Sequence, residues 1–378
     1  MLAIYLISII LIAYTFVGYP IIVIIISFVA GEKNKKEEIY PYVSLVISAY
    51  NEEEVIQKKI ENSLKLDYPS DRLQIVIASE SVDNTNKIVK EYRKKGIILY
   101  EYKCREGKRA TLFKTIPLCK GEIIIFSDAN SFYNNDAIKK IVRNFADKRV
   151  GCVSGRLIYR NIKKGKISQG ESAYWKFDIF LKKHLSRLFA LGGGVNGSIF
   201  AIRKYLYDPI DKYRGDDFEI SCRVELKGYA SVFEDKAISY EEATERAKQE
   251  FRRKIRLASW NFKSTLILIK EAIRKRKLMT LYILVSHRLL RYTTPIWLLL
   301  LFLSNLNLQG LFYKISIFAQ IIFYTFALMG FIYEKIENKE TPIIFLYPFY
   351  FCLVNVAALI AIVNNLVSKD QMFWEKVR

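Results

Sequence analysis

Carboxylate and amide side chains follow an apolar stretch of this chain, where they could hold a metal ion. Asp128 and Asn130 come directly after the run Glu122–Ser127. Oxygen ligands of this kind suit Mg²⁺ or Mn²⁺ that bridges a diphosphate. The alternative is an Asx turn that leads into the next helix. The two residues therefore indicate a metal–diphosphate site without excluding a turn.

A second pair of carboxylates, Asp216 and Asp217, stands at the start of a helical pattern. Adjacent negative charges repel each other, so the pKa of one carboxyl can rise and suit that group to act as a general base. The alternative is an acidic first turn that stabilises the helix dipole. On the first interpretation the pair is a candidate for proton transfer, and on the second it only stabilises the helix.

Cationic side chains are placed where phosphates could bind. Arg105, Lys108 and Arg109 surround a glycine at the expected start of a helix, as in a diphosphate cradle or a solvated loop. Arg252 and Arg256 are one helical turn apart, and they could contact phosphates or lipid headgroups. These side chains could therefore bind a diphosphate, or they could form a solvated loop and contact lipid headgroups.

Two acidic residues follow another apolar run. Glu80 could accept a hydrogen bond from a nucleobase, whereas for Asp83 we favour the capping of the next helix. A nucleobase contact at Glu80 and a purely structural role remain equally open at this point.

The overall composition excludes several other kinds of site. Histidine occurs only twice, and the five cysteines are scattered, which leaves little for a Ser-His-Asp triad or a zinc site and favours a reducing compartment. The net charge of +21 would suit nucleic acid. The basic residues, however, flank apolar segments, and no nucleic-acid recognition motif accompanies them. We therefore expect membrane lipids rather than nucleic acid as partners.

Strand-like and helix-like segments must position these residues. Four apolar strands alternate with amphipathic helices, which predicts an α/β fold with a mostly parallel sheet and flanking helices. The expected strands are Val43–Ser48, Leu73–Ala78, Ile97–Tyr102 and Glu122–Ser127, and the expected helices are Glu52–Lys65, Asn84–Lys94, Lys108–Pro117 and Asn134–Ala146. Ligands of such sheets bind at the carboxyl ends of the strands, where the candidate residues lie.

Both ends of the chain are apolar enough to enter a membrane. Met1–Ala30 contains no charged residue, which favours a membrane anchor over a cleaved signal peptide. Three more runs, Tyr292–Leu308, Leu311–Tyr333 and Pro342–Val367, predict C-terminal transmembrane helices, and Leu281–Arg291 suits a helix in the interface. Basic residues beside the spans place the middle of the chain in the cytosol, at the plasma membrane. The expected division is a span over 1–30, a catalytic domain over 38–275 and membrane helices over 277–378.

The ordered set of motifs resembles the family 2 glycosyltransferases, in particular membrane-bound members of the cellulose-synthase-like subgroup. The resemblance covers residues 40 to 270. The matching segments are Val43–Glu53 (VSLVISAYNEE), Arg105–Leu112 (REGKRATL), Gly121–Asn130 (GEIIIFSDAN), Gly194–Arg203 (GVNGSIFAIR), Asp216–Phe218 (DDF), Tyr240–Glu242 (YEE) and Phe251–Arg256 (FRRKIR).

This resemblance implies a GT-A fold, a nucleotide-diphosphate sugar donor, Mg²⁺ or Mn²⁺, and inversion at the anomeric carbon. It places Asp217 as the catalytic base and Asp128, with Asn130, at the metal. The donor-binding residues that it implies are Ala49, Tyr50, Glu52, Glu80, Lys108, Asp128, Arg253 and Arg256. The acceptor residues that we expect are Tyr174, Trp175, Asn196, Gly197 and Asp216.

The sequence departs from the family pattern in three motifs. Glu80 and Asn130 stand where the family has aspartate or a second carboxylate. Arg253 and Leu257 occupy the Gln and Trp positions of the Gln-x-x-Arg-Trp motif of processive synthases. We therefore expect transfer of a sugar to a lipid-linked or polysaccharide acceptor. A processive polysaccharide synthase and an inactive membrane scaffold are the alternatives.

Overall fold

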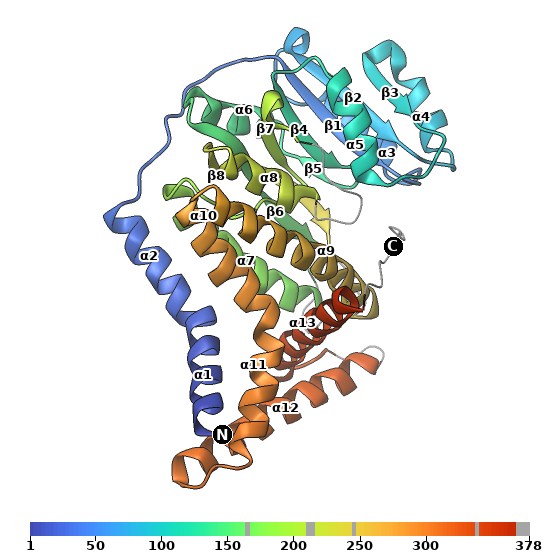
Figure 1. The fold of residues 1–378 in the computed structure, drawn as a ribbon. Helices are drawn as coiled ribbons and strands as arrows, with labels where there is room; N and C mark the ends of the chain where they lie inside the picture. Colours follow the sequence, from blue (N-terminus) through green and yellow to red (C-terminus); the bar gives the residue numbers. More distant parts are fainter. Residues whose placement is uncertain (163–166, 209–215, 244–246, 337–339, 368–378) are drawn as a thin grey trace.

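The computed structural model describes residues 1–162, 167–208, 216–243, 247–336 and 340–367. Figure 1 shows a twisted sheet with helices packed against it at one end of the molecule, and long helices from both ends of the chain at the other. The chain therefore has a sheet domain that stands on a group of apolar helices.

The sheet contains eight strands in the order β3-β2-β1-β4-β7-β6-β8-β5. The strands are β1 (Val43–Ala49), β2 (Leu73–Ser79), β3 (Ile97–Glu101), β4 (Ile123–Asp128), β5 (Phe132–Tyr133), β6 (Val150–Arg160), β7 (Phe200–Arg203) and β8 (Ala230–Glu242). The four expected strands correspond to β1–β4 with ends shifted by a residue or so, and β5–β8 complete a sheet that sequence patterns did not delimit. The expected α/β fold is confirmed.

The register of β1 explains why the candidate residues meet. This central strand pairs in parallel with β2 and with β4, and Ala49 lies opposite Ser79 while Ser48 lies opposite Asp128. Because all three strands end at the same edge, the segments that follow them enter the same space. The antiparallel β7 closes the other side of β4.

Helices flank the sheet on both faces. In the sheet domain they are α3 (Ile56–Leu64), α4 (Thr85–Glu91), α5 (Lys108–Thr115), α6 (Ala137–Val142), α7 (Ile167–Arg187), α8 (Asp216–Leu226) and α9 (Ala247–Arg274). The expected helix over Glu52–Lys65 was wrong at its start, because α3 begins at Ile56. The backbone N–H of Glu52 donates instead to Thr85 Oγ1, at 2.8 Å, which holds the segment across to the β2–α4 loop.

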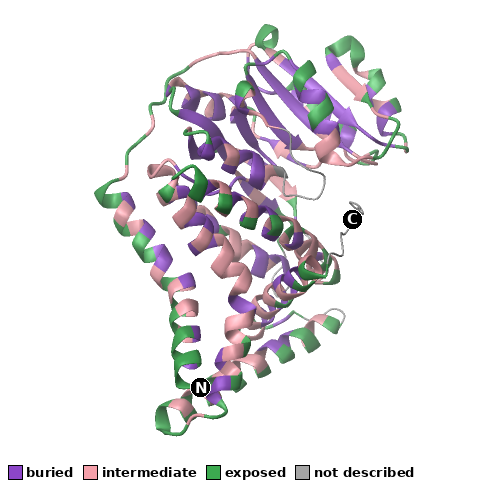
Figure 2. Cartoon of the chain, in the orientation of Figure 1, coloured by how far each residue is buried: buried purple, intermediate pink, exposed green. Residues whose placement is uncertain are grey.

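Two apolar cores lie on the two faces of the sheet. One contains α3, α6 and the inward faces of β1 and β4, and the other contains α5, α7 and α8. The second core also takes in Tyr19 and Val23 of the N-terminal helix and Ile283 from the C-terminal part. The sheet and the apolar helices are thus joined by a shared core, as the buried positions in Figure 2 illustrate.

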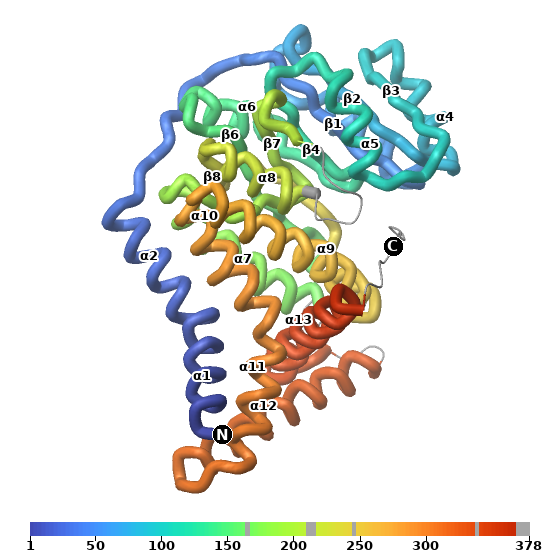
Figure 3. Tube along the Cα trace, in the orientation of Figure 1, coloured from blue at the N-terminus to red at the C-terminus, as the bar shows by residue number. Residues whose placement is uncertain are grey.

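The described residues contain three helices long and apolar enough to cross a membrane: Leu2–Val29, Leu311–Lys335 and Ile343–Leu366. The first consists of α1 (Leu2–Ala13), a π-helical segment (Tyr14–Gly18) and α2 (Tyr19–Val29), and the others are α12 (Leu311–Lys335) and α13 (Ile343–Leu366). Figure 3 traces the N-terminal helix down to the turn between α11 and α12. Membrane helices at both ends were expected, and candidate helices are present at both.

The run Tyr292–Leu308 is not one of these three helices. It forms α11 (Leu290–Asn305), which continues α10 (Leu278–Ile283) and a π-helical segment, Leu284–Leu289. In the interface that we expected for Leu281–Arg291, its polar side chains would face lipid headgroups. Instead all three of Leu284, Ser286 and His287 are buried: the first packs with α8 and α9, and the other two contact the N-terminal helix at Tyr14 and Tyr19.

Candidate active site

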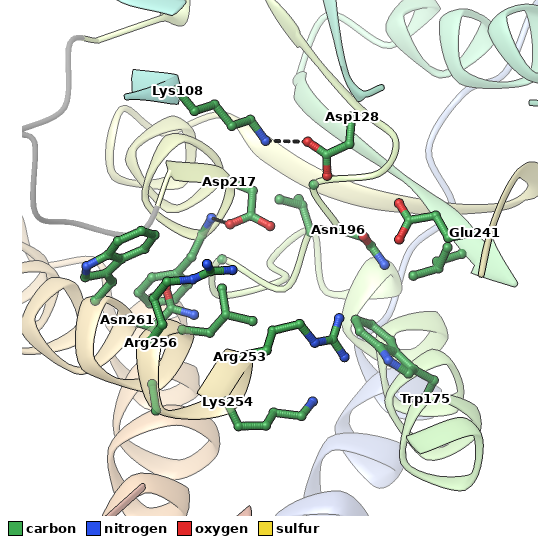
Figure 4. A pocket seen from close by; sticks show the side chains of 18 of the residues that line it. Lys108, Asp128, Trp175, Asn196, Asp217, Glu241, Arg253, Lys254, Arg256 and Asn261 are labelled. Atoms are coloured by element: carbon green, nitrogen blue, oxygen red, sulfur yellow. Dashed lines mark hydrogen bonds and ion pairs between the residues drawn. The ribbon is translucent and has the colours of Figure 1, made fainter. Parts of the chain in front are cut away.

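A single cavity of about 730 Å³ runs from the carboxyl ends of β1, β2 and β4 to the apolar helix α13. The sequence-predicted residues Ala49, Tyr50, Glu52, Glu80, Lys108, Asp128, Asn130, Tyr174, Trp175, Asn196, Gly197, Asp217, Arg253 and Arg256 all line it. The side chain of Asp216 lies outside the described part of the structure. Figure 4 shows Lys108, Asp128, Asp217 and Glu241 around one space.

The donor end, which we define as the part of the cavity formed by the loops after β1–β4, carries paired charges. Lys108 Nζ lies 2.7 Å from Asp128 Oδ1. The Arg105 guanidinium stacks 4.2 Å from the centroid of the Tyr50 ring. These contacts place cations beside the candidate metal ligand, where a diphosphate would carry its charge.

Glu80 has a backbone role in this structure. Its carboxylate is buried and accepts the N–H groups of Glu106, at 3.1 Å, and of Gly107, at 2.9 Å. Gly107 has φ +94°, a left-handed conformation that favours glycine. Glu80 therefore holds the loop that carries Arg105 and Lys108, while it also lines the cavity.

Asp217 and Asp128 come together across Gly197. A Cβ atom on this glycine would lie 3.1 Å from Asp217 Oδ2 and 3.7 Å from Asp128 Oδ2. Asp217 Oδ1 accepts the backbone N–H of Phe218 at 2.8 Å, which orients the carboxylate at the start of α8. Because position 197 has no side chain, a small space stays open between the proposed base and the proposed metal ligand.

Arg253 takes part in an ionic network between α7 and α9. It pairs with Glu171 and with Glu250, at 2.8 Å, while Lys254 lies 3.2 Å from Glu250. Burial lowers the pKa of Arg253, but the neighbouring Tyr159, Glu250 and Glu171 more than offset it and raise that pKa well above its ordinary value. Arg253 is therefore charged and paired with two carboxylates.

Trp260 connects α5 to α9 at the mouth of the donor end. The guanidinium of Arg109 lies 4.6 Å from its ring centroid, and that of Arg256 lies 5.8 Å from it. The predicted acceptor residue Trp175 lies deeper, with its Nε1–H directed to Glu171 at 3.4 Å. The two tryptophans thus mark separate parts of the cavity.

Several cavity residues were missed by sequence reasoning. Glu241, at the end of β8, accepts a hydrogen bond from Ser131 Oγ next to Asp128, and its motif Tyr240–Glu242 was the signal that could have found it. His287, Arg288 and Arg291 line the membrane side. Because their sequence neighbours are apolar, we expected these three residues to lie on a helix in the membrane interface.

The donor set suits a divalent ion only in part. No group of three or more His, Cys, Asp or Glu side chains able to hold a metal occurs among the described residues. Asp128 offers one carboxylate at the cavity wall, with Asn130 beside it. Such a set fits Mg²⁺ or Mn²⁺ if the ligand shell is completed by diphosphate oxygens and water.

Residues 44–210 match the protein-family model described as Glycosyl transferase family 2. The chain carries a glycosyl transferase family 2 domain. The matched part of the chain contains β1–β7 and the Lys108–Asp128 pair, whereas Asp217 and α9 follow it in sequence.

Relatives of the glycosyltransferase domain have lipid and polysaccharide products in their names. The beta-monoglucosyldiacylglycerol synthase of Nostoc sp. is 29% identical over 195 residues, which are 49% of this chain and 42% of that relative. The poly-beta-1,6-N-acetyl-D-glucosamine synthase of Staphylococcus epidermidis is 26% identical over 348 residues, which are 84% of this chain and 82% of that relative. The chain thus spans less than half of the first relative and most of the second.

A solved structure matches nearly the whole chain. The mannosyltransferase PcManGT from Pyrobaculum calidifontis, solved in complex with GDP-Man and Mn²⁺, superposes with a TM-score of 0.71 at 20% identity. The match covers 97% of this chain and 99% of that chain. The shared fold therefore includes the apolar helices as well as the sheet.

Proposed function

We propose that this protein is an inverting glycosyltransferase that transfers a sugar from a nucleotide-diphosphate sugar to an acceptor presented at the cytosolic membrane face. The observation that carries the proposal is the continuous cavity in which Asp128 and Asp217 flank Gly197 and which extends to α13. In this arrangement residues 38–275 form the catalytic domain, held at the plasma membrane by residues 1–30 and 277–378.

Asp217 is the base in this mechanism. Its carboxylate takes the proton of an acceptor hydroxyl as that oxygen forms a bond to the anomeric carbon of the donor sugar. The bond between this carbon and the diphosphate breaks at the same time, and the electron pair leaves with the diphosphate. Attack on the face opposite the leaving group inverts the configuration.

The leaving diphosphate needs positive charge on the other side of the sugar. Lys108 is close to the Asp128 carboxylate, and Arg105 and Arg109 line the same cavity. These three cations can therefore neutralise the phosphates. Mg²⁺ or Mn²⁺ held by Asp128 and the diphosphate would supply further neutralisation when bound. The donor end therefore binds and activates the leaving group, and Asp217 activates the acceptor.

Assays of the purified full-length chain in detergent test the proposal. We expect nucleotide release from one donor in a panel of uridine and guanosine diphosphate sugars, stimulated by a membrane lipid extract. NMR of the product should show inverted anomeric configuration. Absence of release from every donor would overturn the enzyme proposal and leave the membrane scaffold as the better explanation.

A processive polysaccharide synthase is the second candidate, and the similarity to the poly-beta-1,6-N-acetyl-D-glucosamine synthase favours it. Arg253 and Leu257 favour short products, because they stand where processive synthases have the Gln and Trp of their Gln-x-x-Arg-Trp motif. Product length separates the two candidates. A ladder of long polymers would favour the synthase, whereas one sugar added to a lipid would favour the first proposal.

A further inference from the structure

The cavity continues from Asp217 toward the apolar helix α13, and we call this second half the membrane end. It is lined by side chains of α7, of the Leu278–Asn305 helix and of α13. Arg288 and Arg291 line this end of the cavity, and Lys182 of α7 lies close to Arg288 behind the wall; we call these three residues the basic cluster. Gly194 brings two of them together, because its Cβ atom would lie 3.5 Å from Lys182 Cε and 3.7 Å from Arg288 Nη2.

The basic cluster has too few carboxylates to balance its charge. Lys182 pairs with Asp178 at 2.8 Å, and both side chains are buried. Among the described residues, Arg288 forms no ion pair or hydrogen bond, and its guanidinium lies 5.0 Å from the ring centroid of Phe218. Arg291 donates to Tyr174 Oη at 3.2 Å, and its own Nε has no partner there. Within the described part of the chain, neither guanidinium group therefore forms an ion pair, although the carboxylates of Asp178 and Asp217 act on Arg288 from a longer distance.

His287 adds a further polar group without a partner. Its ring is 3% exposed and stacks on Tyr19 with centroids 5.5 Å apart. Neither ring nitrogen has a hydrogen-bond partner among the described side chains and backbone, yet the residue lines the cavity. A buried polar atom left in this way is costly unless a ligand satisfies it.

These unsatisfied groups indicate an anionic ligand. Burying a cation away from water costs on the order of several kcal/mol, unless a counter-charge replaces the water. Guanidinium groups present parallel N–H donors that match the oxygens of a phosphate. The basic cluster is thus suited to a phosphate group, a few ångströms from the residue that follows the proposed base.

The wall beyond the basic cluster is apolar. Phe16 of the N-terminal helix and Phe351 of α13 are in ring contact at 5.7 Å, and Val354 and Ala358 continue along α13. Both helices are candidate membrane spans. A water-soluble phosphate would gain nothing from this wall, whereas a lipid chain would bury apolar surface against it.

We propose that the membrane end binds an acceptor lipid that carries a phosphate group, with the phosphate at Arg288 and Arg291 and the lipid chain against Phe16, Phe351 and Val354. The role of this lipid as the acceptor rests on the proposed function, but its binding does not require catalysis. It separates this chain from an enzyme whose acceptor is neutral diacylglycerol, because that headgroup would leave both guanidinium groups unpaired.

Binding measured without a donor tests the site independently of the reaction. The probes are short-chain phosphatidic acid, the diacylglycerol with the same chains, and inorganic phosphate, each titrated onto the purified full-length chain. We expect phosphatidic acid to bind at least roughly tenfold more tightly than either other probe, since each 1.4 kcal/mol is a factor of ten. The double variant Arg288→Gln/Arg291→Gln should lose this preference by a similar factor.

Two further variants serve as controls. Arg274→Gln removes an exposed cation near the membrane and should bind like the wild type, which excludes a general attraction to anionic lipid. Arg291→Gln alone keeps a donor for Tyr174, and provides the test if the double variant does not fold. Without lipid, the melting temperature of the folded variants should not fall, because an unpaired buried cation has been removed.

Several results would overturn the proposal. Equal affinity for phosphatidic acid and diacylglycerol would show that the site does not recognise the phosphate. Equal affinity for inorganic phosphate would remove the lipid. Unchanged lipid affinity in Arg291→Gln and in the double variant would remove the basic cluster. Failure of every nucleotide sugar in the turnover assay would instead contradict the proposed function and leave this lipid site standing.

Discussion

The two ends of the cavity differ in whether their charged side chains are paired with opposite charges. At the donor end, Lys108 is paired with Asp128, and Glu80 accepts two backbone N–H groups. At the membrane end, Arg288 and Arg291 have no carboxylate partner among the described residues. The donor end is balanced by contacts within the chain, whereas the membrane end has two guanidinium groups outside any ion pair that the described residues form, and we propose that a ligand meets them.

The two ends also differ in how the chain builds them. The donor end comes from consecutive loops that follow β1, β2, β3 and β4. The membrane end joins Phe16, Tyr174, Arg288 and Phe351, which are far apart in sequence. The difference indicates that the proposed nucleotide site is assembled from local motifs, whereas the proposed acceptor site depends on how helices pack.

The largest effect is expected where the two ends meet, at Asp217. Asp217→Asn keeps the shape of the side chain but removes the base, so transfer should fall at least roughly 10²-fold, as is typical for loss of a positioned acid–base group. Donor affinity should stay near the wild-type value. Steady-state kinetics and nucleotide binding measure the two quantities. Asp71→Asn, whose side chain is 80% exposed, is the matched control. Full turnover in Asp217→Asn would dismiss this residue as the base.

The next effect isolates the donor end. Asp128→Ala removes the carboxylate proposed to hold Mg²⁺ or Mn²⁺, so nucleotide binding should weaken by roughly tenfold or more and should no longer respond to Mn²⁺. Calorimetric titration of the nucleotide with and without Mn²⁺ measures this. Chelator should abolish transfer by the wild type. If the variant bound nucleotide in the same metal-dependent way, the assignment of Asp128 would be wrong.

A smaller effect tests whether the donor loop depends on Glu80. In Glu80→Gln one oxygen becomes an NH₂ group that cannot accept the N–H of Glu106 or Gly107. Hydrogen bonds to charged groups contribute about 1.5–3 kcal/mol, so the KM for the donor should rise roughly tenfold while kcat changes little. Glu91→Gln, at an exposed position of α4, is the control. An unchanged KM would mean that the loop keeps its shape without this carboxylate.

The smallest effect lies at the seam between the sheet domain and α10. Glu225 accepts the N–H groups of Leu191 and Gly192 and the hydroxyl of Thr280, and burial raises its pKa from 4.5 to about 7. A raised carboxyl pKa favours folding below the unfolded-state value, and this contribution is lost as pH rises through about 7.

Glu225→Gln should therefore flatten the pH dependence of stability between about pH 4.5 and 7, by at most on the order of 3 kcal/mol. Melting temperatures of the two proteins in detergent, measured across this range, give the difference. The kcat at neutral pH should not change, because Glu225 is remote from the donor end. Parallel stability curves for the two proteins would show that Glu225 does not titrate as expected.

Local sequence was sufficient for the donor end. Apolar runs predicted β1–β4, and parallel strands must end at one edge of a sheet, so Ala49, Glu80, Lys108 and Asp128 had to meet. Uncharged stretches likewise predicted the helices Leu2–Val29, Leu311–Lys335 and Ile343–Leu366, because a membrane span depends on length and composition alone.

Tertiary structure decided the rest. Glu80, expected to face a base, also holds a loop, and Arg253, expected to bind the donor, is also paired with Glu171 and Glu250; both line the cavity. Arg288 and Arg291, expected in the membrane interface, line the cavity. In each case the partner lies in another element, and the angle at which two elements pack is set by side chains from both. A periodic pattern records which face of a helix is apolar, but it does not record what that face will meet.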